Sequence, residues 1–194
     1  MLSVALATLT ACGSGDAGGG VPVRRLQDAA LLAASDPTRC PLDLGLADAM
    51  AGVRPVRGGG AATGTPVGRV PGGSSLLAVG GASYRCAYQV DGRPLTLVVV
   101  AVPEGRQTAD AVGALTTPLE EVGLDRAATR SLVDAAKAAR ARSGVAAPSG
   151  SASAASTELG GGGAASVAIV AAEGGPTGVQ LATAAEALAE ELAG

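Results

Sequence analysis

The 194-residue chain has no histidine, phenylalanine, tryptophan or asparagine, and its only aromatic residues are Tyr84 and Tyr88. Without histidine it has no imidazole general base, no Ser-His-Asp triad and no histidine-bound zinc or haem. Without asparagine it has no acceptor for N-linked glycans, and two tyrosines supply no platform for stacking nucleic-acid bases or sugar rings. These absences exclude chemistry that depends on imidazole, and we expect no metal site and no cofactor.

Charge and length narrow the class of protein further. The chain carries 14 basic and 17 acidic residues, which gives a formal net charge of −3, whereas proteins that wrap nucleic acid are normally basic. We therefore expect no nucleic-acid partner. No apolar run approaches the roughly 18 residues that a membrane-spanning helix needs. The length suits one domain with tails.

An uncharged apolar segment, MLSVALATLTA, precedes Cys12. It is too short to cross a bilayer and fits the hydrophobic region of a signal peptide. The sequence of Leu9–Cys12, LTAC, resembles the bacterial lipobox, in which the chain is cleaved before a cysteine that carries a diacylglyceryl group. We expect a signal peptide at residues 1–11, a lipid on Cys12 and a flexible tether over residues 12–20. The alternative is a buried N-terminal helix with an incidental cysteine.

The two remaining cysteines are Cys40 and Cys86. In an exported protein an even pair indicates a disulfide, because the compartment is oxidising. The bond closes a loop of about 46 residues, for which the entropy of the unfolded chain predicts roughly 4 kcal/mol of stabilisation. A redox pair and two unpaired thiols are the alternatives, although a redox pair usually has a C-x-x-C spacing, which is absent here.

Side-chain periodicity predicts several regular elements. Residues 84–90 alternate between apolar and polar, Asp91-Gly92 is typical of a type I′ turn, and residues 95–102 form a β-branched run, so we expect a hairpin. Thr117–Glu120 (TPLE) has the pattern of a capping box with proline at the first helical position. Helices are expected at residues 26–34, 43–50, 108–115, 117–122, 125–141 and 181–192. Further strands are expected at 166–172 and 177–180.

Two segments rich in small residues lack periodicity, so we expect loop insertions at residues 52–73 and 143–165. The first contains Arg54, Arg57 and Arg69 and no acidic residue. These arginines predict contact with an anionic surface, such as phosphate head groups or a wall polymer. The alternative is a solvated, mobile loop. Together these elements predict a single α+β domain over residues 21–194, with a small antiparallel sheet of three to four strands and helices packed on one face.

The order of motifs resembles small envelope lipoproteins of actinobacteria that carry a single-disulfide domain of unknown function. The resemblance lies in the lipobox at Leu9–Cys12, in Cys40-Pro41 followed by a short helix, and in Tyr84–Tyr88 (YRCAY), which opens the hairpin. More loosely, the chain is similar to the extracellular sensor domains of some actinobacterial receptor kinases. The resemblance implies an α+β fold and an extracytoplasmic location, and it supplies no catalytic residue.

We therefore expect a lipid-anchored, non-catalytic binding or accessory module on the outer face of the cell membrane. Its expected partners are the membrane, through the lipid on Cys12, and an envelope protein or an apolar ligand. One alternative is a carrier or sensor that holds an apolar ligand between sheet and helices, and a deep apolar pocket would favour it. A second alternative is an envelope hydrolase that uses carboxylates only, and convergent, desolvated carboxylates would favour it.

Overall fold

The computed structural model describes residues 20–50, 56–64 and 72–194, and over residues 57–64 it describes the backbone alone. The strands in these ranges are β1 (Val56–Gly64), β2 (Ala82–Val90), β3 (Arg93–Val102), β4 (Val145–Ala146), β5 (Ala152–Glu158) and β6 (Ala164–Ala171). The α-helices are α1 (Val23–Ser35), α2 (Leu46–Ala49), α3 (Thr108–Ala114), α4 (Thr116–Glu121), α5 (Arg126–Ala138) and α6 (Gly178–Ala193). A short 3-10 helix, η1 (Leu77–Val79), precedes β2.

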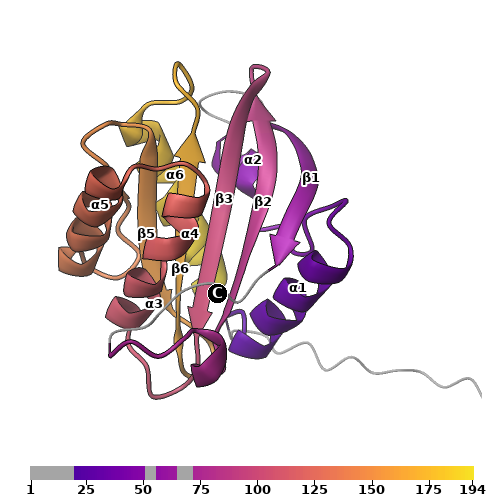
Figure 1. Ribbon diagram of the computed structural model, residues 1–194, viewed down its shortest axis with the longest axis vertical. Helices are drawn as coiled ribbons and strands as arrows, with labels where there is room; N and C mark the ends of the chain where they lie inside the picture. Colours follow the sequence, from indigo (N-terminus) through magenta and orange to yellow (C-terminus); the bar gives the residue numbers. More distant parts are fainter. Residues whose placement is uncertain (1–19, 51–55, 65–71) are drawn as a thin grey trace, which may run out of the picture.

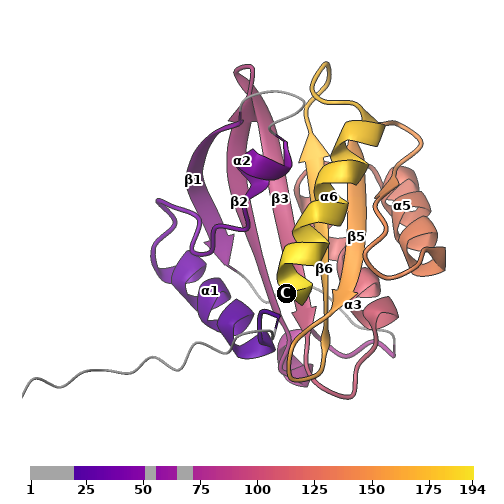
Figure 2. The same ribbon diagram turned by 180° about the vertical axis from the view of Figure 1, so that it is seen from behind.

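The strands form one antiparallel sheet with helices on both faces. The strand order is β1-β2-β3-β6-β5-β4 in a six-stranded sheet, and every neighbouring pair is antiparallel. Helices α1, α2 and α6 cover one face, and α3, α4 and α5 cover the other (Figures 1 and 2). The predicted α+β class and antiparallel sheet are confirmed. The prediction of three to four strands with helices on one face is wrong.

Strand β3 explains why helices are needed on both faces. Its residues from Leu97 to Val102 are all buried. Leu97 and Val99 belong to the core on the side of α1 and α6, whereas Val98 and Val100 belong to the core on the side of α3 and α5. A strand with apolar side chains on both faces needs cover on both faces. The continuous apolar run in the sequence therefore indicated a second layer of helices.

The predicted loop insertion at residues 143–165 is wrong, because this segment contains β4 and β5. Residues 152–157 are all buried although they are only alanine, serine and threonine. Small side chains give a weak strand signal, but they allow helices to approach the sheet closely. A Cβ atom at Gly144 would collide with the carbonyl oxygen of Ala182 in α6. Close packing against α6 thus selects the small residues that made this segment resemble a linker.

The predicted loop insertion at residues 52–73 is also wrong in part, because β1 lies within it. β1 pairs with β2 from Val56 opposite Val90 to Gly64 opposite Tyr84, with an irregularity in the register between Gly58 and Ala62. Its glycine-rich sequence has no strand periodicity, so the backbone of β2 determines its conformation. The other residues of this predicted loop that precede Gly72 lie outside the described residues.

Two local structures predicted from the sequence, a capping box and a short strand, are wrong. In both places a helix begins in a different way. Helix α4 begins at Thr116 and its N-cap residue, Leu115, makes no capping side-chain bond, so the capping box expected at Thr117–Glu120 is not formed. The short strand expected at residues 177–180 is instead the start of α6. There the Thr177 backbone N–H donates to the Gln180 side-chain oxygen over 2.9 Å, in a reciprocal capping box. The T-x-x-Q pattern signalled this start.

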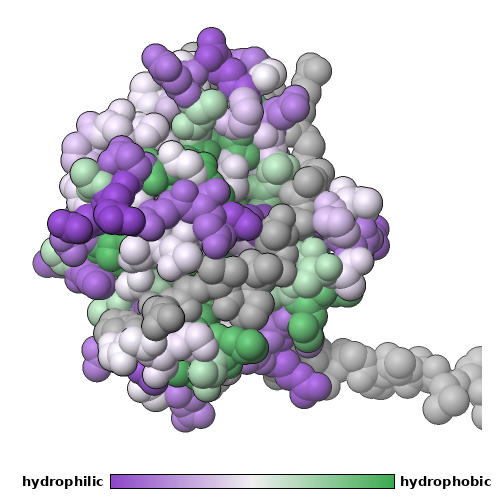
Figure 3. Space-filling model, in the orientation of Figure 1, coloured by the Kyte–Doolittle hydropathy of each residue, from purple (hydrophilic) through white to green (hydrophobic). Residues whose placement is uncertain are grey.

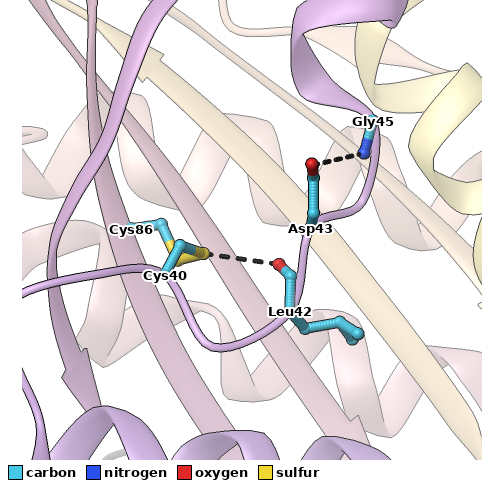
Figure 4. Close-up of a disulfide and its surroundings, with 5 residues drawn as sticks. All are labelled: Cys40, Leu42, Asp43, Gly45 and Cys86. Carbon is cyan, nitrogen blue, oxygen red and sulfur yellow. Dashed lines mark hydrogen bonds between the residues drawn. A yellow bond between two sulfur atoms is a disulfide. The ribbon is translucent and has the colours of Figure 1, made fainter.

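The hairpin and the disulfide are confirmed. Asp91 and Gly92 both have positive φ angles, 50° and 74°, as a type I′ turn requires. Cys40 and Cys86 are joined by a disulfide with a Cα–Cα distance of 5.4 Å. Cys86 is fully buried on β2, so the bond fastens the segment after α1 to the sheet (Figure 4). The alternative of two unpaired thiols is thereby excluded.

Candidate binding groove beside helix α1

The site residues expected from the sequence are only partly within the described structure. Cys12, Arg54 and Arg69 lie outside the described residues, and Arg57 lies in β1, where the backbone alone is described. Within the described residues, the expected site residues that lie together are Cys40 and Cys86.

The disulfide organises the loop that follows α1. Cys40 Sγ lies 3.4 Å from the carbonyl oxygen of Leu42, and Leu42 and Leu44 are buried beneath the loop. The Asp43 carboxylate accepts a hydrogen bond of 3.0 Å from the backbone N–H of Gly45, which has a left-handed φ of 62° (Figure 4). This tight turn leads directly into α2. The contacts around the disulfide are those of a structural bond that orders a loop.

Helix α1 exposes two large apolar side chains. Its buried face consists of Leu26, Ala29, Ala30 and Ala33. Leu31 and Leu32 lie outside this face and are 70% and 55% exposed. The buried face is built mainly from alanine and lies close to the sheet, so the two adjacent leucines have no place beneath the helix. Figure 3 shows hydrophobic residues reaching the surface over α1.

The 3-10 helix η1 lies beside α1 and contributes a third exposed leucine. Leu76 is fully buried and anchors η1, whereas the next residue, Leu77, is 65% exposed. The Gln27 side-chain amide donates a hydrogen bond to the carbonyl oxygen of Gly80 and ties η1 to α1. After it, Gly81 passes so close to β3 that a Cβ would lie 2.8 Å from the Ala101 carbonyl oxygen. The position of η1 is thus fixed on three sides.

Between these two elements lies a groove of about 400 Å³, which we call the α1–η1 groove. Its lining residues are Arg24, Gln27, Asp28, Ala30, Leu31, Ala34, Leu77, Gly80, Gly81 and Ala82. The walls are mainly apolar, and Arg24 and Asp28 add two charged side chains to the lining. Such a groove suits an apolar group with a polar neighbour. A second hollow of about 320 Å³ lies around the other exposed leucine of α1, Leu32, and the disulfide residue Cys40.

The carboxylate-only alternative has one candidate location, at the end of α6. Burial raises the pKa of Glu191 above its usual range, and the nearby carboxylates of Asp43 and Asp48 raise it further. All three residues are nevertheless exposed. In the part of the chain that the structure describes, no three histidine, cysteine or acidic side chains gather in a way that could hold a metal ion.

Several buried hydroxyl groups lack a partner. Within the described residues, the hydroxyls of Tyr84, Ser153 and Ser166 are buried without a hydrogen bond. Burial raises the pKa of Tyr84 far above its usual value, and it raises the pKa of Tyr88 to about 12. Both phenols are therefore neutral at physiological pH. None of these hydroxyls lines one of the grooves described above.

Comparison with known proteins adds no family to this description. No protein-family model matches the chain, and neither the curated proteins nor the solved structures contain a match. Across residues 20–50, 56–64 and 72–194, no helix is long and apolar enough to span a membrane. From the sequence we expect a helix over residues 26–34 and assign no role to Leu31 or Leu32. Their position outside the stripe of Leu26, Ala30 and Ala33 was the available signal.

Proposed function

We propose that the chain is a lipid-anchored, non-catalytic binding module of the cell envelope that faces outward from the cell membrane. In this proposal a diacylglyceryl group on Cys12 attaches it to the membrane, and the α1–η1 groove binds an apolar partner. The observation that carries the binding role is the exposure of Leu31 and Leu77 on the two walls of one groove. Exposed apolar side chains that gather beside a hollow are typical of interaction sites.

The packing of the sheet supports a surface binding role over a carrier with an internal cavity. Side chains from α1, α2 and α6 fill one face of the sheet, and side chains from α3, α4 and α5 fill the other. The groove instead lies at the surface, where Leu31 is 70% exposed. A ligand bound in this groove is only partly enclosed, and its other side faces solvent, a membrane or a protein. This arrangement is typical of a docking surface.

The start of the domain supports an anchor at Cys12. The backbone N–H of Val21 donates a hydrogen bond of 2.8 Å to the carbonyl oxygen of Leu192, which fixes the beginning of the described chain to the end of α6. Only seven residues, most of them glycine or serine, separate Cys12 from Gly20. A lipid at Cys12 would therefore hold the domain close to the membrane.

Fractionation of cells that express the full chain tests the anchor. The unaltered chain is expected in the membrane fraction, and Cys12→Ala is expected in the soluble fraction, because it removes the thiol that accepts the lipid. Ser14→Ala changes a neighbouring residue of the tether and is the matched control, expected to stay with the membrane. Equal distribution of the Cys12→Ala and Ser14→Ala variants would contradict the proposal.

A second candidate function is a hydrolase that uses carboxylates only, and the raised pKa of Glu191 favours it. A carboxyl group whose pKa is raised holds its proton more tightly, which is the direction that a general acid requires. Hydrolysis of envelope-derived esters and glycosides by the purified chain, and its loss in Glu191→Gln, tests this function. Activity that Glu191→Gln retains, or no activity in either chain, excludes this role for Glu191.

A further inference from the structure

We propose that the partner of the α1–η1 groove is the lipid bilayer to which the chain is tethered. In this arrangement α1 and η1 lie against the outer leaflet, and Leu31, Leu32 and Leu77 insert at the boundary between the head groups and the acyl chains. The inference rests on the proposed anchor at Cys12 and deepens it, because it assigns the domain one orientation on the membrane. The tether then limits how far the domain moves from the membrane, and the leucines determine which face of the domain contacts the bilayer.

The length of chain between the anchor and the domain supports this arrangement. Cys12 lies eight positions before Gly20, so an extended linker places the anchor within about 27 Å of the domain. The domain begins directly before α1, and Leu31 is only about 12 Å along the helix axis from Val23. The exposed leucines therefore lie at the part of the domain that the tether holds nearest to the membrane.

The charges on this face suit a membrane interface. Arg24 and Arg25 lie in the first turn of α1, Arg39 follows the helix, and all three are exposed. Guanidinium groups pair well with phosphate, and apolar side chains between them are typical of helices that lie in the head-group region. The acidic side chains of this face are Asp28, Asp36 and Asp43. Three arginines balance three aspartates on this face, so it lacks the net negative charge of the whole chain.

The small size of the apolar surface favours a bilayer over a protein partner. A stable protein interface buries about 800 Å² on each side, and three leucines around one groove supply only part of such an area. A tethered surface needs much less intrinsic affinity, since the linker keeps it at high effective concentration. Weak insertion of three leucines is then sufficient to orient the domain.

Fluorescence of a single introduced tryptophan tests the proposal, because the chain has none of its own. Cys12 is the one cysteine outside the disulfide, so the full chain can be coupled there to a maleimide lipid in phosphatidylcholine–phosphatidylglycerol vesicles. Lipids brominated on their acyl chains should quench the fluorescence of Leu31→Trp. Val179→Trp is the matched control, because Val179 is 77% exposed on the first turn of α6, at the far end of that helix from its C-terminus (Figure 2).

A second measurement removes the apolar contact and uses no tryptophan. For the uncoupled full chain, partitioning onto the same vesicles should fall about tenfold in a Leu31→Ser and Leu77→Ser double variant, and Val179→Ser should leave it unchanged. Equal quenching at positions 31 and 179, or partitioning that the double variant does not alter, would overturn the proposal. Emission of Leu31→Trp that changes with protein concentration without vesicles would also overturn it and identify a second copy as the occupant. Both tests bypass natural lipidation, so their failure leaves the Cys12 fractionation result unaffected.

Discussion

The side-chain amide of Gln27 donates a hydrogen bond to the carbonyl oxygen of Gly80 and thereby joins α1 to the end of η1. The two residues are 53 positions apart in the chain, yet this contact holds together the two walls of the α1–η1 groove. Neither wall alone forms a site. The groove depends on how α1 and η1 are fixed to the same edge of the fold.

Gln27→Ala is expected to loosen η1. Removing one hydrogen bond at a partly exposed position costs about 0.5–1.5 kcal/mol, and the loss should concentrate in the segment that Gln27 holds. Hydrogen exchange of the backbone amides around Leu77 should accelerate in this variant. Gln89→Ala, at an exposed position of β2, is the control. Unchanged exchange around Leu77 would show that Leu76 alone positions η1.

Removal of the disulfide is expected to destabilise the domain strongly. In the double variant Cys40→Ser and Cys86→Ser, the unfolded chain regains the freedom of a loop with a sequence separation of 46, which corresponds to roughly 4 kcal/mol. For a domain of this size such a loss lowers the melting temperature by roughly 8–16 °C. Cys12→Ser controls for the change of residue type. A double variant with the same melting temperature as the unaltered chain would show that the disulfide contributes no stability.

Tyr84→Phe is expected to stabilise the fold. The Tyr84 hydroxyl is buried and has no hydrogen-bond partner among the described residues. The free-energy cost of removing this hydroxyl from water is therefore not offset by a hydrogen bond in the folded state. Phenylalanine fills the same space without that group, and the free energy of unfolding should rise by about 1 kcal/mol. Denaturant unfolding measures the change, with Tyr88→Phe as control. A marked loss of stability in Tyr84→Phe would indicate that the hydroxyl has a partner.

The stability of the fold is expected to depend on the ionisation of Glu191. Burial and the nearby Asp43 and Asp48 raise its pKa in the folded state, so the folded chain holds the proton more tightly than the unfolded chain. Stability is therefore lost as the pH rises from the ordinary glutamate range through the raised pKa. Glu191→Gln removes the charge and should be more stable at neutral pH. The gain is about 0.5 kcal/mol, because solvent screens this exposed group.

Thermal unfolding of Glu191→Gln across a range of pH checks whether the variant is more stable than the unaltered chain, as predicted. The advantage of the variant should vanish at about pH 3, where glutamate is neutral in both folded and unfolded chains. Glu186→Gln, at an exposed position of the same helix, separates the effect from a general change of charge. A variant that is less stable than the unaltered chain at neutral pH would contradict the assignment.

The hairpin and the disulfide could be predicted from the sequence. The signal for the hairpin is local, and the signal for the disulfide is the number of cysteines. Strand β2 alternates cleanly, with Tyr84 and Cys86 buried and Gln89 exposed. Asp91-Gly92 has a marked preference for the turn that joins β2 to β3. The cysteine pair followed from the count alone once Cys12 was assigned to the lipid. These features need no knowledge of the rest of the fold.

The outer strands and the groove could not be predicted in the same way. β5 consists of small residues whose strand conformation depends on β6 beside it and α6 above it. β1 is rich in glycine, and its pairing with β2 shifts register between Gly58 and Ala62. The α1–η1 groove depends on Gln27 meeting Gly80, a long-range contact. In all three cases tertiary contacts determine the structure, and the local sequence carries little information about them.

Mass spectrometry of the N-terminal peptide tests the proposed lipid anchor at Cys12. The chain should be expressed at full length in a bacterial host that processes lipoproteins, extracted from the membrane and digested. If Cys12 carries the anchor, the digest should contain a peptide that begins at Cys12 and carries a diacylglyceryl group on its sulfur. An unmodified peptide that begins at Met1, or one in which Ala11 is still joined to a free Cys12, would contradict lipidation at Cys12.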